Sequence, residues 1–563
     1  MIKNTRSTSA TAEIPLGDVA AGLREGQSLD VIANQLQLES SHELMDRTAK
    51  SLGIEVLDLE NQTVEPEAIE GFPVKLIHRF EVFPVRRTDR ELTLAIANPF
   101  DFNAIDSVAS ATDLEVHPVM ASAEVVRRLI KKHLGVGAET VDGLVALKKD
   151  QSGEVEMLED VQLDGSEDAE MAQQASVVRL VNEILSEAIE ARASDIHIEA
   201  QESGIKIRYR IDGVLQRQPV PAEMNQFQSA IVSRLKIMAR LNIAEKRVPQ
   251  DGRIKLRVSG REVDIRVSMI PMLHGEGIVM RILDKDNLAF SLRGIGMSEE
   301  IYSQFQKLIR LPHGIVLVTG PTGSGKTTTL YSALSEIKSE DTKIITTEDP
   351  IEYQLEGINQ IQVHQKVGLT FAACLRAILR HDPDVVLVGE IRDLETAENA
   401  TQASLTGHLV FSTLHTNDSA GAFMRLCDMG VEPFLVSSTV EGVLAQRLVR
   451  KLCDQCCEEY VPNLEDLPED FPFARWQSER GTLFQPAGCE ACRGTGYRGR
   501  MGIYELLVAS PEVRNLANQR AASTEIKRAA MQGGMKTLRD DGWDKAIRGL
   551  TTVDEVLRVT KSD

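Results

Sequence analysis

Two kinds of hydrophobic pattern divide this chain. Between about residues 171 and 286, apolar and polar residues alternate in short stretches, which predicts half-buried strands. These stretches lie at 195–199, 205–210, 253–258, 263–267 and 277–283. From about residue 298 onward the apolar runs are continuous, which is typical of fully buried strands. These runs lie at 314–319, 384–388 and 409–414.

The amino-terminal part of the chain shows mixed signals. Helical spacing at 29–36, 44–49 and 125–134, with an alternating strand at 91–97, predicts a small α/β domain over residues 1–140. No motif with catalytic chemistry occurs there, so we interpret it as a docking domain. Residues 151–170 contain no Lys or Arg and are rich in acidic residues, which indicates a flexible acidic linker over 141–171.

Glycines predict turns in the later parts. Asp212-Gly213 and Asp251-Gly252 are expected to connect strands. The segment 511–559 has helical spacing, with turns expected at Gly533-Gly534 and at Gly542.

Composition narrows the class of protein. A 563-residue chain with 42% hydrophobic and 26% charged residues is ordinary for a globular protein of several domains. The net charge of −21 argues against nucleic acid or an anionic membrane surface as the main partner. No apolar run reaches the length of a membrane span and no secretory signal is visible, so we expect a cytoplasmic protein. In that compartment the seven cysteines favour thiols or metal ligands over disulfides.

The candidate chemistry centres on residues 320–327, which fit the phosphate-loop pattern G-x-x-x-x-G-K-[ST]. A buried strand precedes the loop and a helical pattern follows it, as the binding of phosphate to backbone N–H groups requires. Lys326 would reach the β- and γ-phosphates of ATP or GTP, and the Thr327 hydroxyl would bind Mg²⁺. The nucleotide-binding residues are therefore expected to be Gly320, Pro321, Thr322, Gly323, Ser324, Gly325, Lys326, Thr327 and Thr328.

Two strand ends after the loop carry acids. The strand predicted at 343–348 ends with Glu348 before Pro350, and the run at 384–388 is followed by Glu390. Because the carboxyl ends of parallel strands meet at the edge where ligands bind, we expect both acids near the phosphates. One carboxylate can hold the hydration shell of Mg²⁺ and the other can orient the attacking water. Either acid alone is also explained as a cap or turn residue.

His408 and His415 flank the strand predicted at 409–414 and are candidates for sensing the nucleotide. Arginines recur on the polar face of the alternating strands. On the wet side of a sheet such arginines are ordinary, whereas arginines that face a nucleotide stabilise charge on a transferring phosphoryl group. The sequence does not separate these two interpretations.

Two C-x-x-C pairs supply a candidate metal site. Four thiolates match the tetrahedral coordination that zinc prefers, although a redox pair is the alternative for either motif. The long gap between the pairs predicts a small subdomain over 453–492, pinned at its base. The expected zinc ligands are Cys453, Cys456, Cys489 and Cys492.

An ordered set of segments resembles the secretion ATPases of the type II secretion and type IV pilus group. These segments are 193–199, 210–213, 249–253, 320–327, 347–352, 382–393, 406–417 and 445–448. The resemblance is dense from residue 177 onward and looser over 49–134. Residues 402–408 and 442–450 are more similar to the type II secretion branch, and the four cysteines argue against the shorter retraction motors.

The resemblance implies an α/β architecture. A RecA-like P-loop ATPase core over 291–563, with the zinc subdomain, would follow an arginine-bearing α+β PAS-like module over 172–290 and the docking domain. It also implies a homo-hexamer, peripheral to the cytoplasmic side of the inner membrane through platform proteins and without nucleic acid. This motor would hydrolyse ATP to drive pseudopilus assembly and protein export; the alternative is type IV pilus assembly.

The resemblance further implies site roles. Glu348 would polarise water, and Glu390 would hold Mg²⁺. The catalytic set would be Glu348, Glu390, Lys326, His408, His415, Arg266 and Arg281, with Arg376 and Arg380 approaching the phosphates or a subunit boundary.

Two other function classes fit the phosphate loop. A nucleic-acid translocase would show ATPase activity that DNA stimulates and moderate salt abolishes, but the net charge argues against it. A non-hydrolysing, nucleotide-gated scaffold would keep full secretion after Glu348→Gln. Lys326→Ala should abolish nucleotide use in all three classes and does not separate them.

Overall fold

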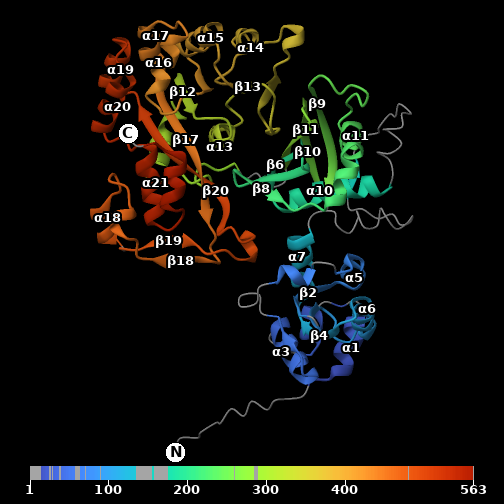
Figure 1. Ribbon diagram of the computed structural model, residues 1–563. Helices are drawn as coiled ribbons and strands as arrows, with labels where there is room; N and C mark the ends of the chain where they lie inside the picture. The colour runs from blue at the N-terminus through green and yellow to red at the C-terminus, as the bar shows by residue number, and fades with distance from the viewer. Residues whose placement is uncertain are drawn as a thin grey trace, which may run out of the picture. The chain divides into compact units, whose positions relative to one another are not determined.

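Figure 1 shows a computed structural model of the chain, which divides into two compact units, residues 1–284 and 285–563. The structure describes residues 14–134, 155–157, 175–284 and 290–561, apart from short gaps at 25–26, 28, 37, 39, 58–63, 70–71, 89, 259 and 480. Among these described residues, no helix combines the length and apolarity needed to cross a membrane.

The first unit opens with three helices and a four-stranded sheet of order β1-β4-β3-β2. The helices expected at 29–36, 44–49 and 125–134 and the strand at 91–97 are confirmed, because alternate residues such as Leu92 and Leu94 turn into the core. The elements are α1 (Leu16–Arg24), α2 (Leu29–Gln35), α3 (Ser41–Leu52), β1 (Glu55–Val56), α4 (Pro66–Ile69), α5 (Val74–Phe80), β2 (Val82–Arg87), β3 (Glu91–Ile96), α6 (Phe102–Thr112), β4 (Glu115–Met120) and α7 (Ala123–Leu134).

A seven-stranded antiparallel sheet of order β5-β9-β10-β11-β6-β7-β8 follows. Its apolar positions, such as Ile196 and Ile265, pack with Leu180 and Leu235 of two helices. The alternation therefore leaves the charged positions on the opposite face. The elements are β5 (Val155–Met157), α10 (Ala175–Glu190), β6 (Ala193–Gln201), β7 (Gly204–Ile211), β8 (Val214–Gln218), η1 (Ala222–Phe227), α11 (Gln228–Met238), β9 (Gln250–Val258), β10 (Arg261–Met272) and β11 (Gly275–Asp284).

Two features of this part differ from the sequence expectations. Within the expected linker 141–171, residues 155–157 form an edge strand, where Glu156 lies opposite Arg257 of β9. The rest of that segment up to residue 174 lies outside the described residues. The turn expected at Asp251-Gly252 is wrong, because both residues lie within β9. A Cβ at Gly252 would lie 2.5 Å from the carbonyl oxygen of Ala239, so glycine permits a close approach of two backbones here.

The second unit is built on a seven-stranded sheet of order β14-β13-β15-β16-β12-β17-β20, parallel except for β20 (Tyr497–Val508). Every residue of β12, β15 and β16 is buried, because helices cover both faces of the sheet. The elements up to the last parallel strand are α12 (Glu299–Leu308), β12 (Gly314–Thr319), α13 (Lys326–Ile337), β13 (Ile344–Glu348), β14 (Asn359–Gln362), η2 (Gln365–Val367), α14 (Phe371–Ile378), β15 (Val385–Val388), α15 (Leu394–Leu405), β16 (Leu409–Leu414), α16 (Gly421–Asp428), α17 (Pro433–Thr439) and β17 (Val440–Leu452).

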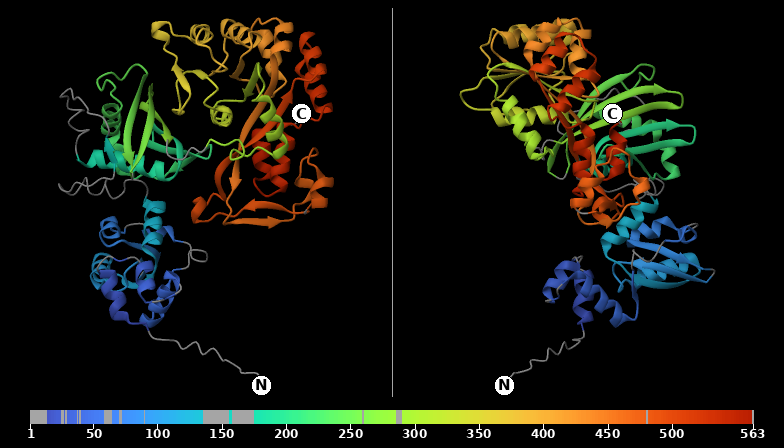
Figure 2. Two further views of the ribbon diagram at one scale, coloured as in Figure 1. Left: turned by 180° about the vertical axis from the view of Figure 1, so that it is seen from behind. Right: turned by 90° about the vertical axis from the view of Figure 1, so that its left-hand side faces the viewer.

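A small insert and a helical tail complete the second unit. The rings of Phe471 and Trp543 meet edge to face at 5.5 Å, which anchors the insert on the tail. Two of the red tail helices in Figure 2, α21 and α22, lie beside the strands β17 and β20. The elements are β18 (Cys457–Tyr460), η3 (Leu464–Asp466), α18 (Phe473–Glu479), β19 (Leu483–Pro486), η4 (Glu490–Cys492), β20 (Tyr497–Val508), α19 (Pro511–Asn518), α20 (Ser523–Gln532), α21 (Leu538–Ile547) and α22 (Val553–Val559).

Gly542 does not form the expected turn but lies inside α21. A Cβ there would lie 2.6 Å from Cγ1 of Val556 on α22. The glycine therefore lets two helices pack closely, and the turn at Gly533-Gly534 is confirmed between α20 and α21.

Candidate nucleotide site and cysteine cluster

The expected strand, loop and helix are confirmed as β12, residues 320–325 and α13. Three loop glycines have left-handed φ values: 149° at Gly320, 79° at Gly323 and 90° at Gly325. A Cβ at Gly320 would lie 2.6 Å from the carbonyl oxygen of Gln446. The path of the loop therefore depends on glycine at these positions.

Lys326 begins α13 and turns back over the loop. Its Nζ donates hydrogen bonds to the carbonyl oxygens of Gly320, at 2.8 Å, and Pro321, at 3.2 Å. Burial lowers the pKa of Lys326, and the charge of Glu390 opposes this shift. Thr327 is exposed and Thr328 is half-buried at the start of the same helix. The loop thus presents an ammonium group and an exposed hydroxyl on neighbouring residues.

Strand register brings the predicted acids to the edge of the sheet where this loop lies. Thr319, which ends β12, pairs with Leu414, which ends β16. Val388 of β15 pairs with Ser412 of β16 and with Thr347 of β13. The segments that follow these strand ends therefore share one edge, as expected for a parallel sheet.

Glu390 lies just after β15 and contacts His415. Its Oε2 is 3.2 Å from His415 Nε2, and its Oε1 is 2.7 Å from Arg392 Nη2. The carboxylate is only 14% exposed, so these contacts hold it at the sheet edge. The charge of Glu390 partly offsets the lowering of the Lys326 pKa by burial.

Glu348 is more deeply enclosed than Glu390, at 4% exposure. The Tyr331 hydroxyl donates to its Oε2. Its Oε1 accepts hydrogen bonds from the Thr346 hydroxyl, at 2.6 Å, and from Gln360 Nε2, at 3.1 Å. Sequence reasoning found the acid but none of its three partners, because each occupies an ordinary helix or strand position.

The structure separates the two histidines. His408 precedes β16 and lies at the amino end of β12, where its carbonyl oxygen accepts from the Gly314 N–H at 3.2 Å. Its Nδ1 lies 2.9 Å from the carbonyl oxygen of Ala403. The length of β16, roughly 20 Å at the usual rise per residue, separates it from His415. Of this pair, His415 is the histidine at the edge that carries the phosphate loop.

Arg376 and Arg380 lie on and just after α14. Arg376 forms an ion pair with Glu395 at the start of α15. Arg380 Nη1 donates to the carbonyl oxygen of Arg376 at 2.7 Å. These contacts hold both arginines on the helical layer beside β13 and β15.

A row of arginines crosses the charged face of the antiparallel sheet in the first unit. Arg253, Arg266 and Arg281 are register partners on three adjacent strands and line a cavity of 470 Å³. Asp195 continues the row, and its Oδ1 accepts from Arg281 Nε at 3.0 Å. The predicted Arg266 and Arg281 thus have a third arginine, Arg253, beside them. The net positive charge of this row suits an anionic ligand.

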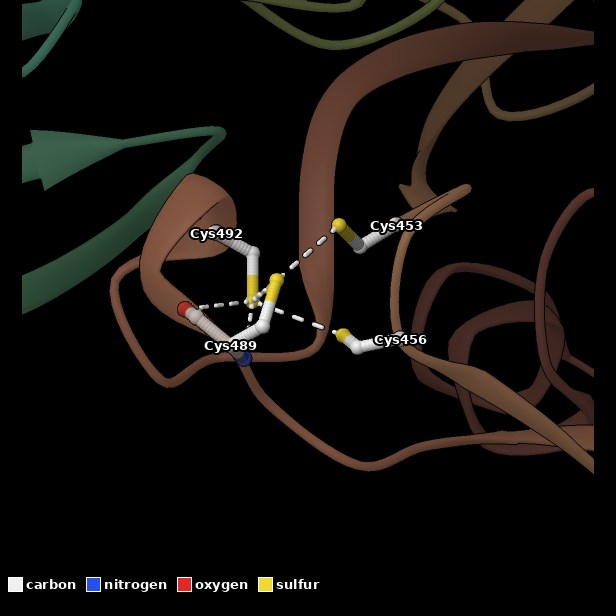
Figure 3. Close-up of side chains that lie close together, drawn as sticks. All are labelled: Cys453, Cys456, Cys489 and Cys492. Atoms are coloured by element: carbon white, nitrogen blue, oxygen red, sulfur yellow. Dashed lines mark hydrogen bonds between the residues drawn. The ribbon is translucent and has the colours of Figure 1, made fainter. Parts of the chain in front are cut away.

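The four predicted cysteines form one cluster, drawn in Figure 3. The Sγ atoms of Cys453 and Cys489, and those of Cys456 and Cys492, are 3.7 Å apart, and those of Cys489 and Cys492 are 3.8 Å apart. A tetrahedral zinc site with Zn–S bonds of about 2.3 Å requires S–S separations of about 3.8 Å. The donor set and its spacing therefore fit zinc.

Backbone N–H groups support charge on these sulfurs. The N–H groups of Cys489 and Gly496 donate to Cys492 Sγ at 3.0 and 3.1 Å. Burial raises the pKa of Cys492, but these donors, together with the thiols of Cys456 and Cys489, outweigh burial and lower the pKa to about 6. Burial raises the pKa of Cys456 to about 12. A bound cation is what allows four thiolates to share such a cluster.

Comparison with known proteins assigns a family. A family model described as "Type II/IV secretion system protein" matches residues 170–558, and an MshEN domain model matches residues 52–140. "Type II secretion system protein E" of Xanthomonas campestris pv. campestris is 45% identical, over 95% of this chain and 94% of that protein. "Type IV pilus assembly ATPase PilB" of Myxococcus xanthus is 42% identical, over 92% of this chain and 91% of that protein.

Among solved structures, the pilus retraction motor PilT with bound ADP is 27% identical, with a TM-score of 0.46, and the match covers 68% of this chain and 96% of that one. Several further relatives, including those of Vibrio cholerae and Pseudomonas aeruginosa, also carry the name of type II secretion proteins. The chain therefore belongs to the type II/IV secretion system protein family, whose members include secretion ATPases.

Proposed function

We propose that this chain is the ATPase motor of a type II secretion system. It hydrolyses ATP to ADP and phosphate and couples the reaction to pseudopilus assembly and protein export. The observation that carries this proposal is the single sheet edge that gathers the phosphate loop with Glu348, Glu390 and His415. The near full-length similarity to type II secretion protein E supports it.

The residues at this edge have separate roles in phosphate binding, metal binding and hydrolysis. Loop amides and Lys326 bind the phosphates, and Lys326 exchanges the carbonyl oxygens of Gly320 and Pro321 for the β- and γ-phosphate oxygens. Thr327 and Glu390 would hold Mg²⁺, which would supply positive charge to the phosphates. Glu348 orients the attacking water.

The arginines complete the proposed machinery. The arginine row of Arg253, Arg266 and Arg281 supplies positive charge that suits an anionic group such as a phosphate. Arg376 and Arg380 act at the phosphates or at a subunit boundary, from the helical layer beside β13 and β15.

The cysteine cluster binds one structural zinc ion. Cys453 directly follows β17, and Cys492 lies shortly before β20, so a metal there closes one end of the β17–β20 ribbon.

The assembly is a homo-hexamer on the cytoplasmic side of the inner membrane. It is peripheral to that membrane and reaches it through platform proteins. The net charge of −21 supports this arrangement over direct binding to nucleic acid or anionic lipid.

The test compares phosphate release and nucleotide binding in the full-length protein. Glu348→Gln should still bind ATP but lose at least roughly 100-fold in kcat, because the water loses its orienting base. Lys326→Ala should lose binding as well. Turnover by Glu348→Gln at the wild-type rate would contradict the motor. Light scattering with ADP present measures the oligomer, and a mass below six chains would contradict the hexamer.

A type IV pilus motor is the second candidate, because the similarity to PilB spans 92% of this chain. Deletion of the gene in its own host distinguishes the type II secretion motor from the pilus motor. Loss of secreted enzymes with intact pili supports the type II assignment, and loss of pili with intact secretion supports the pilus motor.

A further inference from the structure

Tyr331 connects the phosphate-loop helix to Glu348. It lies on α13, which begins at Lys326, and it is 1% exposed. Its hydroxyl donates to Glu348 Oε2. This contact makes Tyr331 a physical link between the loop and the candidate catalytic acid.

The direction of this hydrogen bond is determined by protonation. Burial, the charge of Glu348 and the hydrogen bond itself all raise the pKa of Tyr331 above its ordinary value of 10. The hydroxyl therefore keeps its proton at physiological pH, so Tyr331 is the donor and the carboxylate is the acceptor.

The position of the Tyr331 ring is restricted by two other rings. Phe290 lies edge-on at 5.5 Å between ring centroids, and Tyr353 lies edge-on at 6.5 Å. Gln360 Nε2 joins the same group, since it donates to the carbonyl oxygen of Tyr353 at 3.0 Å and to Glu348 Oε1. The ring packing therefore determines where the hydroxyl meets the carboxylate.

The carboxylate is held from three elements. Tyr331 of α13 holds Oε2, while Thr346 of β13 and Gln360 of β14 hold Oε1. A carboxylate oxygen has two acceptor sites, so Oε2 can accept from Tyr331 and from one water at the same time. The contacts therefore orient the Glu348 carboxylate and leave an acceptor site for a water molecule.

We propose that Tyr331 is a positioning residue for hydrolysis, with Thr346 holding the second carboxylate oxygen. Because Tyr331 belongs to the helix that begins in the phosphate loop, the orientation of Glu348 follows any movement of that helix. The inference rests on the proposed role of Glu348 in hydrolysis.

The test is Tyr331→Phe in the full-length protein, with kcat and KM for ATP measured separately. Loss of one hydrogen bond to a charged group should lower kcat roughly 10- to 100-fold. KM should stay within about twofold, because Lys326 and the loop are untouched. Thr346→Val should give the same kcat-specific loss and carries the test if Tyr331→Phe is unfolded.

Tyr302→Phe is the matched control. The Tyr302 hydroxyl donates to Glu336 Oε1 at 2.8 Å, near the far end of the same helix α13. This variant also loses a tyrosine–carboxylate hydrogen bond on α13, but kcat should stay at the wild-type value. An equal loss of kcat in Tyr331→Phe and Tyr302→Phe would show that the effect is structural and would overturn the proposal.

A double variant separates this inference from the function on which it rests. Tyr331→Phe combined with Glu348→Gln should have the residual rate of Glu348→Gln alone, because a positioning residue acts only through the acid. A further loss in the double variant would overturn the proposal. Wild-type kcat in Tyr331→Phe beside an inactive Glu348→Gln overturns only the Tyr331 inference. Wild-type turnover in Glu348→Gln overturns the proposed role of Glu348 itself.

Discussion

Gln446 Nε2 donates a 2.6 Å hydrogen bond to the carbonyl oxygen of Ser324, in the middle of the phosphate loop. Its Oε1 accepts from the Thr329 hydroxyl at 2.7 Å, so one side chain of β17 holds both the loop and the first turns of α13. Gln446 is 1% exposed, so these bonds are shielded from bulk water. The loop is therefore held by a distant strand as well as by its own glycines.

Gln446→Leu should weaken nucleotide binding. The change keeps the size of the side chain but leaves the Ser324 carbonyl and the Thr329 hydroxyl without their partner. We expect a stability loss of about 2 kcal/mol and roughly tenfold weaker binding of ADP. Thermal unfolding and fluorescence titration measure the two effects. Gln519→Leu, which removes an exposed amide that donates to Asn515, is the control. Unchanged ADP affinity in Gln446→Leu would contradict the prediction.

Substitution of the two histidines should affect different properties, kcat for His415 and stability for His408. His415→Ala removes the contact with Glu390 and should lower kcat roughly tenfold. His408→Ala removes a hydrogen bond to Ala403 at the opposite sheet edge and should cost about 1 kcal/mol of stability. Steady-state phosphate release at saturating ATP, compared at equal oligomer size, measures the first effect. Equal kcat losses in the two variants would show that both histidines act on the nucleotide.

Loss of zinc from the cysteine cluster should destabilise the insert over residues 453–492. Freshly purified, reduced protein should contain about one zinc ion per chain, and Cys492→Ser should lower both the zinc content and the melting temperature, by roughly 5 °C or more. Cys374→Ser changes a buried thiol of α14 outside the cluster and should leave the zinc content unchanged. Elemental analysis and thermal unfolding measure these effects. Zinc clearly below one ion per chain in wild-type protein would rule out the assigned site.

Glu555 should make the tail sensitive to acid. Burial raises the pKa of Glu555, but hydrogen bonds from Arg558 and Arg450 outweigh burial and lower the pKa to about 2. Because the folded value lies below the ordinary value of 4.5, the stabilisation is fully present above pH 4.5 and is lost as the pH falls towards 2. The shift corresponds to about 3 kcal/mol.

Glu555→Gln should therefore lose about 3 kcal/mol at pH 7, and its stability should fall less than that of the wild type between pH 4.5 and pH 2. Urea unfolding at several pH values measures this. Glu525→Gln, at an exposed position of α20, should follow the wild-type curve. If the free energy of unfolding of Glu555→Gln and of the wild type changed with pH in parallel, Glu555 would not be the cause of the acid sensitivity.

Local patterns predicted much of this fold. The buried runs became β12, β15 and β16, and the alternating stretches became the antiparallel sheet. The turns expected at Gly252 and Gly542 were wrong, because a glycine also permits close packing and the sequence does not distinguish the two uses. His408 and His415 flank one strand, and because a strand places its two ends on opposite edges of the sheet, only His415 lies at the edge of the phosphate loop.

The phosphate loop and the two C-x-x-C pairs can be found from the sequence alone, because each is a contiguous motif whose chemistry depends on short spacing. The residues that hold these motifs in place can be identified only from the fold. Gln446 reaches Ser324 across 122 positions of the chain, and Tyr331 reaches Glu348 from a neighbouring helix. Such contacts depend on strand order and helix packing, which hydrophobic periodicity does not encode. The side chains that support the site therefore could not be predicted from the sequence pattern.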